Sequence, residues 1–186
     1  MKAKHFVSLT VTQSIIFFAS SLIFPFYILF LNNVGSSYSQ FGFAYGLFAL
    51  SSALFHPIIG RWSKKFEGQS FLIAHSWGMA LVLLFIPNLV LIEHVYLIQL
   101  ILGLLGALQK HGEKTVVANL TDGGDRGPKI GNYHFWTSIF SAVAIMIGGF
   151  LADFFTIELI FYCSSVLYVG SGWVLLKWRN TDIRKD

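Results

Sequence analysis

Residues Phe6–Gly60 decide the fold, and they read FVSLTVTQSIIFFASSLIFPFYILFLNNVGSSYSQFGFAYGLFALSSALFHPIIG. The stretch contains no Asp, Glu, Lys or Arg. A helix needs about 20 apolar residues to cross the hydrocarbon core of a bilayer, so the stretch is long enough for two crossings. Polar and small residues at 32–37 are typical of a turn. The sequence therefore predicts two membrane-spanning helices here, over roughly residues 6–31 and 40–60.

Three further charge-free stretches follow, at residues 68–92, 130–152 and 159–176. A further apolar run lies between the first two of these stretches, at about residues 89–108. Together the four segments predict four more spans, and the fourth span of the chain has room to extend toward Leu120. We expect an all-α membrane protein in which residues 1–186 form a single domain of six transmembrane helices. The four additional spans are expected at about residues 71–87, 89–108, 134–154 and 157–178.

The composition excludes an ordinary water-soluble domain. Of the 186 residues, 55% are hydrophobic and only 12% are charged. Soluble domains carry about 25% charged residues. A chain of this length cannot hide so much apolar surface from water, because small domains leave much of their surface exposed. The lipid bilayer is therefore the first partner that the sequence predicts.

The basic residues predict the orientation, because Lys and Arg accumulate in the cytoplasmic segments of membrane proteins. Three of the expected connections, near 32–39, 87–94 and 153–158, hold none of the thirteen. We therefore expect a multi-pass protein of the cell membrane with both termini in the cytoplasm. The net charge of +4 then reports topology, and a nucleic-acid surface is not indicated. The thirteen are Lys2, Lys4, Arg61, Lys64, Lys65, Lys110, Lys114, Arg126, Lys129, Lys177, Arg179, Arg184 and Lys185.

Polar residues inside spans are the first place to look for a site, because burying them in lipid is costly. Gln13 and Gln99 lie deepest in their expected spans, and we predict that they face a solute cavity. An ordinary hydrogen bond between helices is the simpler interpretation of each. The histidines mostly fall near span ends, and His56 and His75 lack the spacing of a metal site. No cofactor is indicated.

Glycines within the spans favour close approach of helices, because they have no Cβ atom. We expect a packing role for all of them, and a sliding contact that lets helices rock is the functional alternative. The glycines concerned are Gly42, Gly46, Gly103, Gly106, Gly148 and Gly149.

Four ordered motifs resemble the major facilitator superfamily. Residues Gly60–Gly68 (GRWSKKFEG) are similar to the signature loop between the second and third spans of that family. Residues Leu97–Ala107 (LIQLILGLLGA) resemble its fourth span, and Ala118–Asp122 (ANLTD) the exit from that span. Residues Gly148–Asp153 (GGFLAD) resemble the end of its fifth span. The resemblance covers essentially the whole chain in order.

The resemblance implies one half of a twelve-helix transporter, in which a small solute binds at the midplane between two six-helix bundles and moves by alternating access. The charged tail at 179–186 stands where the central linker of the family begins, so the amino-terminal half is implied. Three interpretations remain open. The chain pairs with itself, pairs with a separately encoded second half, or is a truncated and inactive remnant.

The resemblance also implies a cytoplasmic gating loop, with two departures from the family pattern. Lys64 stands where the family has an Asp, which reverses the charge. Gln99 stands where the family has an Arg, which removes a charge and weakens a proton-antiporter interpretation. The residues implied for the gating loop are Gly60, Arg61, Lys64, Lys65 and Glu67.

Two other classes of membrane protein have a similar number of spans. An intramembrane serine protease needs a G-x-S-G elbow and a partner His, whereas Gly170–Gly172 (GSG) lacks this spacing and the sixth span holds no His. We therefore expect no enzyme. The six-helix substrate-capture subunit of a multi-component importer has the same size and span count. A pair of matching three-helix repeats would favour the facilitator half over this alternative.

Overall fold

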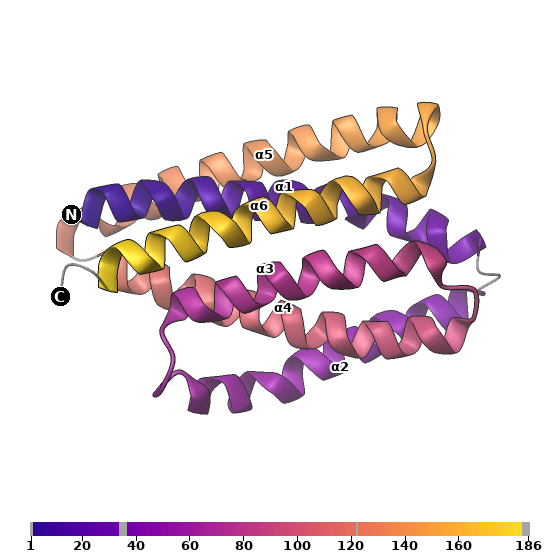
Figure 1. Cartoon of the computed structure of the whole chain (residues 1–186), viewed down its shortest axis with the longest axis horizontal. Helices are drawn as coiled ribbons and strands as arrows, with labels where there is room; N and C mark the ends of the chain where they lie inside the picture. Colours follow the sequence, from indigo (N-terminus) through magenta and orange to yellow (C-terminus); the bar gives the residue numbers. More distant parts are fainter. Residues whose placement is uncertain (1, 34–36, 122, 184–186) are drawn as a thin grey trace.

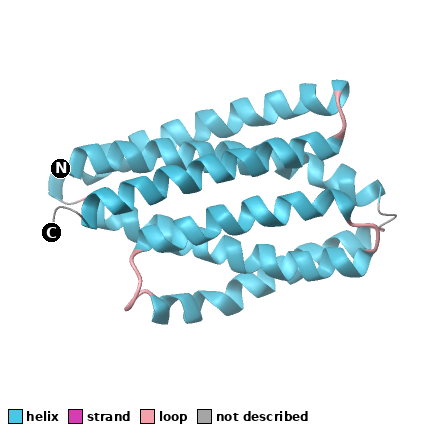
Figure 2. Cartoon of the chain, in the orientation of Figure 1, coloured by secondary structure: helices cyan, strands magenta, loops and turns pink. Residues whose placement is uncertain are grey.

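The computed structural model describes residues 2–33, 37–121 and 123–183, and within them it contains helices and no strand. Figure 2 shows that short loops join the helices at the two ends of the bundle. All six long helices of this described part are apolar and long enough to span a membrane, which confirms the predicted fold class. They are α1 (Lys2–Asn33), α2 (Tyr38–Trp62), α3 (Gly68–Phe85), α4 (Ile92–Leu120), α5 (Arg126–Phe154) and α6 (Ile157–Ile183), with short 3-10 helices at Ile86–Asn88 and Gly123–Asp125.

Local sequence explains where α2 begins and where α3 ends. Ser37 and Gln40 form a capping box, in which the Gln40 amide donates to Ser37 Oγ (3.3 Å) and the Ser37 amide donates to Gln40 Oε1 (2.8 Å). These bonds satisfy amide groups that a helix start leaves without partners. Pro87 lies in the 3-10 turn that follows α3, because proline has no amide hydrogen to continue the helix.

Two helices run further than the predicted spans. Helix α4 continues past residue 108 to Leu120, the extension for which the sequence leaves room, and α5 begins at Arg126 instead of near residue 134. Charged residues limit the part of a helix that can lie in lipid, but they do not end the helix itself. One contact joins these two extensions, since the Tyr133 hydroxyl donates to Glu113 Oε1 at 2.7 Å.

The helices pack in a pattern that repeats when helices 1–3 are exchanged with helices 4–6. Helix α2 packs along α4 as α5 packs along α1, and α3 contacts α4 as α6 contacts α1. The contacts of α3 with α6 and of α1 with α4 map onto themselves, whereas the small α5–α6 contact has no counterpart of similar size between α2 and α3. In space the bundle is two similar groups of three helices, α1 with α5 and α6 and α2 with α3 and α4, packed together mainly through α3 and α6 (Figure 1).

The chain threads back and forth along the long axis of the bundle (Figure 1). Both termini lie at one end, together with the α2–α3 and α4–α5 connections, while the other three connections lie at the opposite end. Every segment rich in Lys and Arg is thus at the same end. The predicted grouping of these segments on one side of the membrane therefore matches the structure.

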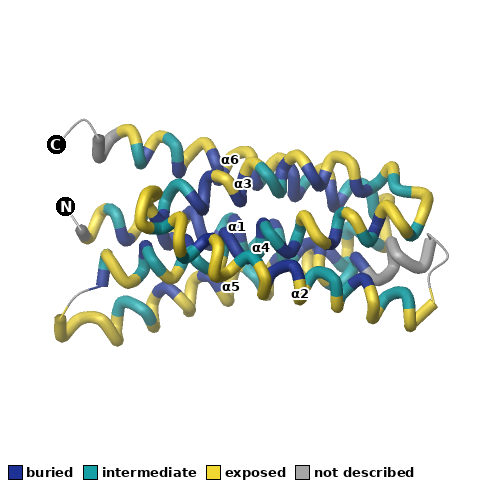
Figure 3. The backbone as a smooth tube through the Cα atoms, turned by 90° about the horizontal axis from the view of Figure 1, so that it is seen from below, coloured by how far each residue is buried: buried dark blue, intermediate teal, exposed yellow. Residues whose placement is uncertain are grey.

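Burial is uneven among the helices (Figure 3). In the most apolar window of each helix, α1 buries 56% of its residues, whereas α2 buries 22% and α5 buries 17%. Exposed side chains on α2 and α5 are largely apolar, for example Phe43, Leu50, Met146 and Phe150. These two helices therefore flank the bundle and turn apolar faces outward.

Candidate solute cavity

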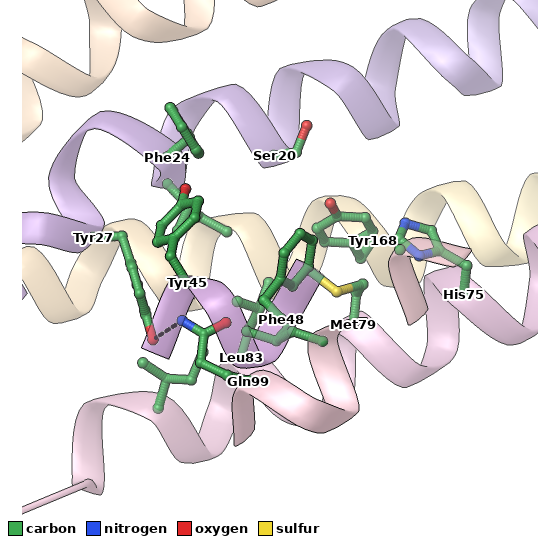
Figure 4. A pocket seen from close by; sticks show the side chains of 14 residues that line it. Ser20, Phe24, Tyr27, Tyr45, Phe48, His75, Met79, Leu83, Gln99 and Tyr168 are labelled. Carbon is green, nitrogen blue, oxygen red and sulfur yellow. Dashed lines mark hydrogen bonds between the residues drawn. The ribbon is translucent and has the colours of Figure 1, made fainter. Parts of the chain in front are cut away.

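An apolar cavity of about 270 Å³, partly open to the surroundings of the bundle, lies between α1, α2, α3, α4 and α6 (Figure 4). It occupies the half of the bundle that is remote from the chain termini. Its wall is formed largely by aromatic and aliphatic side chains. The residues that line it are Ser20, Ile23, Phe24, Tyr27, Tyr45, Phe48, His75, Met79, Leu83, Ile86, Gln99, Leu102, Gly106 and Tyr168.

Gln99 is a buried polar group on the wall of this cavity. Only 3% of its surface is exposed, and its Nε2 donates to the Tyr27 hydroxyl at 2.9 Å (Figure 4). The bond joins α4 to α1, which have few other contacts. A buried amide is costly unless it is hydrogen-bonded, so Tyr27 stabilises Gln99 in this position.

His75 lines the cavity from α3, at the end away from Gln99 (Figure 4). Its Nδ1 lies 2.9 Å from the Leu105 carbonyl oxygen, so Nδ1 is the nitrogen that carries a hydrogen. The imidazole also meets the edge of the Tyr168 ring, at 5.5 Å between ring centroids. Nothing in the sequence pointed to Tyr168 as the neighbour of His75.

Gln13 has a different environment from Gln99. It is fully buried, and its Oε1 accepts a hydrogen bond of 2.6 Å from Gln109 Nε2 on α4. It does not line the cavity described above. The two glutamine bonds, Gln13 with Gln109 and Gln99 with Tyr27, join α1 to α4 at two levels. The solute role expected for Gln13 remains a prediction.

The segment expected to gate the cytoplasmic end is partly helical. Gly60 and Arg61 belong to the last turn of α2, which ends at Trp62, and only the following residues form a loop. Lys64, Lys65 and Glu67 line a polar hollow of about 440 Å³ together with the last turns of α4. The hollow is therefore bounded by the loop and by α4, and a gating role for these residues remains a prediction.

Another contact ties the ends of α1 and α6 beside the same hollow. Trp178 Nε1 donates to His5 Nδ1 at 2.8 Å, and both residues line the hollow. Glu113, on the part of α4 that extends beyond the predicted span, accepts the hydrogen bond from Tyr133.

The glycines of the spans fall into two groups. A Cβ atom at Gly103 would lie 2.5 Å from the Phe48 carbonyl oxygen, and one at Gly148 would lie 2.5 Å from the Phe26 ring. At Gly106 the nearest atom, in the Phe48 ring, is 3.3 Å away. A Cβ atom would meet nothing within 4 Å at Gly42, Gly46 or Gly149. A packing role for these last three concerns a surface outside the bundle and remains a prediction.

The side chains of the cavity are uncharged or weakly basic. None of the lining residues is Asp, Glu, Lys, Arg or Cys. Across the part of the chain that the structure describes, no three His, Cys, Asp or Glu side chains gather closely enough to hold a metal ion. The arrangement can enclose a small molecule and accept or donate hydrogen bonds to it.

Fold and cavity together define a multi-pass, all-helical membrane protein with an apolar cavity inside its bundle. The model of the Major Facilitator Superfamily matches residues 9–185, and the chain belongs to this family. A protein of Bacillus subtilis (strain 168), described as the uncharacterized MFS-type transporter YitZ, is 63% identical over 161 residues. That alignment covers 87% of this chain and 98% of the relative. Family membership places the chain in membrane transport, points away from catalysis, and does not favour an importer capture subunit.

Proposed function

We propose that this chain is a half-transporter that moves a small solute across the cell membrane by alternating access, together with a second six-helix bundle. The observation that carries the proposal is the pairing of an internal cavity with two flanking helices that turn apolar faces outward. Family membership supports the proposal of a half-transporter, because two such bundles enclose the solute path in transporters of this type.

The second bundle is either another copy of this chain or a separately encoded half. Gly42 and Gly46 lie four residues apart on α2, and a Cβ atom at either position would meet no atom of the bundle within 4 Å. A small-xxx-small pair allows close approach of two helices in lipid. The relative described above, which one bundle covers almost entirely, is compatible with both kinds of partner. We propose α2, together with the exposed α5, as the face that meets the second bundle.

The orientation belongs to the same proposal. We place both termini, the α2–α3 connection and the α4–α5 connection in the cytoplasm, because these segments and the helix ends that adjoin them hold all the Lys and Arg residues. Lys64, Lys65 and Glu67 then lie on the cytoplasmic side, where they would control access from that compartment. Gln13 and Gln99 would contact the solute as the bundles rock.

Pairing can be tested by crosslinking the purified chain in liposomes. A cysteine that replaces Gly46, in a background without the native Cys163, should form a disulfide-linked dimer if two copies meet through α2. A cysteine at Trp173, which is exposed on α6, is the matched control and should stay monomeric. Equal crosslinking at both positions would contradict this face. Monomers at every position, with uptake in cells only when a second chain is co-expressed, would indicate a separate half.

Solute movement is tested by uptake of a panel of small labelled solutes into the same liposomes. Gln99→Leu and Gln13→Leu are expected to abolish uptake while insertion stays normal. Thr137→Val, a buried change on α5 that leaves the cavity untouched, should preserve uptake. Full uptake in both glutamine variants would remove these residues from the site. Failure of the native chain to move any solute, alone or with a co-expressed half, would identify it as an inactive remnant.

A further inference from the structure

The wall of the internal cavity carries no formal charge. Its polar members are hydroxyl groups, one carboxamide and one imidazole. An ion that entered would lose its hydration without meeting an opposite charge, and this loss is expensive in an apolar interior. The cavity therefore disfavours anions and cations alike.

Two side chains offer hydrogen-bond acceptors to a molecule in the cavity. The amide nitrogen of Gln99 is engaged with Tyr27, which leaves its carbonyl oxygen as the group that can accept. His75 carries its hydrogen on Nδ1, so Nε2 is an acceptor, and this buried atom has no hydrogen-bond partner among the described residues. These two atoms would therefore each accept a hydrogen bond from a bound molecule that carries a donor.

Met79 lines the same cavity as His75, one helical turn further along α3. Nε2 is covered in the present conformation. Met79 has a long, unbranched and adaptable side chain, so it can yield to a bound molecule at small cost. Gln99 needs no such change, and the two acceptors lie at opposite ends of the labelled wall (Figure 4).

The size and shape of the wall limit the ligand further. The volume of about 270 Å³ is near the lower end of pockets that hold small molecules, which begin at roughly 300 Å³. Phe24, Tyr45, Phe48 and Tyr168 surround this space with aromatic rings (Figure 4). Aromatic walls favour flat apolar groups through ring contacts.

We infer that the cavity binds an uncharged molecule of about one aromatic ring that donates a hydrogen bond to Gln99 or His75. The inference rests on the proposed function in that it names the solute class. The binding site itself lies within a single bundle, between α1, α2, α3, α4 and α6. Binding therefore does not require the second bundle, whereas transport does.

The test uses the purified chain in lipid nanodiscs, with 2-phenylethanol as the probe. Saturation-transfer NMR, corrected with protein-free nanodiscs, gives the affinity. Methyl 2-phenylethyl ether has the same ring but no donor, and we expect it to bind about 3–10-fold more weakly. The 2-phenylethylammonium cation and the phenylacetate anion test charge, and each is expected to bind at least about 10-fold more weakly than the alcohol.

Variants then locate the acceptor through the ratio of alcohol to ether affinity. Gln99→Leu or His75→Phe should abolish the preference for the alcohol and leave ether binding nearly unchanged. Thr137→Val serves as the control and should keep the preference. The ratio is insensitive to a general loss of folded protein, because both ligands report on the same sample.

Equal binding of alcohol and ether by the native chain would overturn the inference, even if no variant folds. Tight binding of either ion, or a preference that survives in the Gln99→Leu/His75→Phe double variant, would do the same. Binding without any solute movement in liposomes would contradict the proposed function but support the binding site. Movement of a charged solute without binding of the alcohol would contradict the binding site but support the proposed function.

Discussion

The contact between Gly103 and α2 leads to a quantitative prediction about packing. A Cβ atom at Gly103 would lie 2.5 Å from the Phe48 carbonyl oxygen and 2.7 Å from Ser51 Cβ. The nearer atom belongs to the backbone, so it cannot swing away as the end of a side chain can. Gly103→Ala therefore forces α4 and α2 apart along the contact that joins them.

The size of the effect follows from two opposing contributions. Overpacking of a well-packed site costs about 1–3 kcal/mol. Replacing glycine by alanine inside a helix returns up to about 1 kcal/mol. At Gly149 only the second contribution applies, because a Cβ atom there meets nothing within 4 Å. The free energy of unfolding of Gly103→Ala should therefore be about 1–3 kcal/mol lower than that of Gly149→Ala. Gly106→Ala, in which the new methyl group touches only the Phe48 ring, should have an intermediate free energy of unfolding.

The measurement is equilibrium unfolding of the three variants in mixed detergent micelles, followed by circular dichroism. Each variant is compared with the native chain under the same conditions. The helix contribution is common to all three substitutions, so the differences among them isolate packing. If Gly103→Ala were as stable as Gly149→Ala, the close approach of α4 to α2 described above would be wrong.

Three other expectations can be checked with the same preparations. Tyr133→Phe removes a hydrogen bond to a carboxylate of α4 and should cost about 1–3 kcal/mol in the unfolding titration, and an unchanged midpoint would show that this bond contributes nothing. Ser51→Ala removes a bond between α2 and a carbonyl of α4 and should cost about 0.6 kcal/mol, so a loss of several kcal/mol would contradict the assignment. In an otherwise cysteine-free chain, an impermeant thiol reagent applied to intact cells should label a cysteine at Asn88 and spare one at Lys64, and equal labelling would refute the proposed orientation.

The number and order of the helices could be predicted because lipid imposes a strong and simple constraint. Charge-free runs of sufficient length identify spans without any knowledge of their partners. The ends of α4 and α5 were less predictable, since the charged residues at 110–114 and 126–129 lie in helix that continues beyond the apolar run. Such extensions depend on contacts between distant segments, such as the bond from Tyr133 to Glu113.

The cavity could be predicted only in part. Gln99 stood out because a carboxamide deep in a span is rare and expensive, and the structure places it on the cavity wall. Tyr27 and Tyr168 did not stand out, because a tyrosine in an apolar helix resembles any other aromatic residue. Which faces meet is also hidden from the sequence, since these helices are apolar on nearly every side and carry no stripe that marks the interior.

The neutral wall of the cavity has an energetic consequence for the cell. Moving one elementary charge through a membrane potential of 100 mV involves about 2.3 kcal/mol of electrical work. An uncharged cargo held by uncharged side chains involves none, so voltage neither drives nor opposes its passage. If no ion moves together with the cargo, the concentration ratio of the cargo across the bilayer would then set the direction of net flow through this bundle.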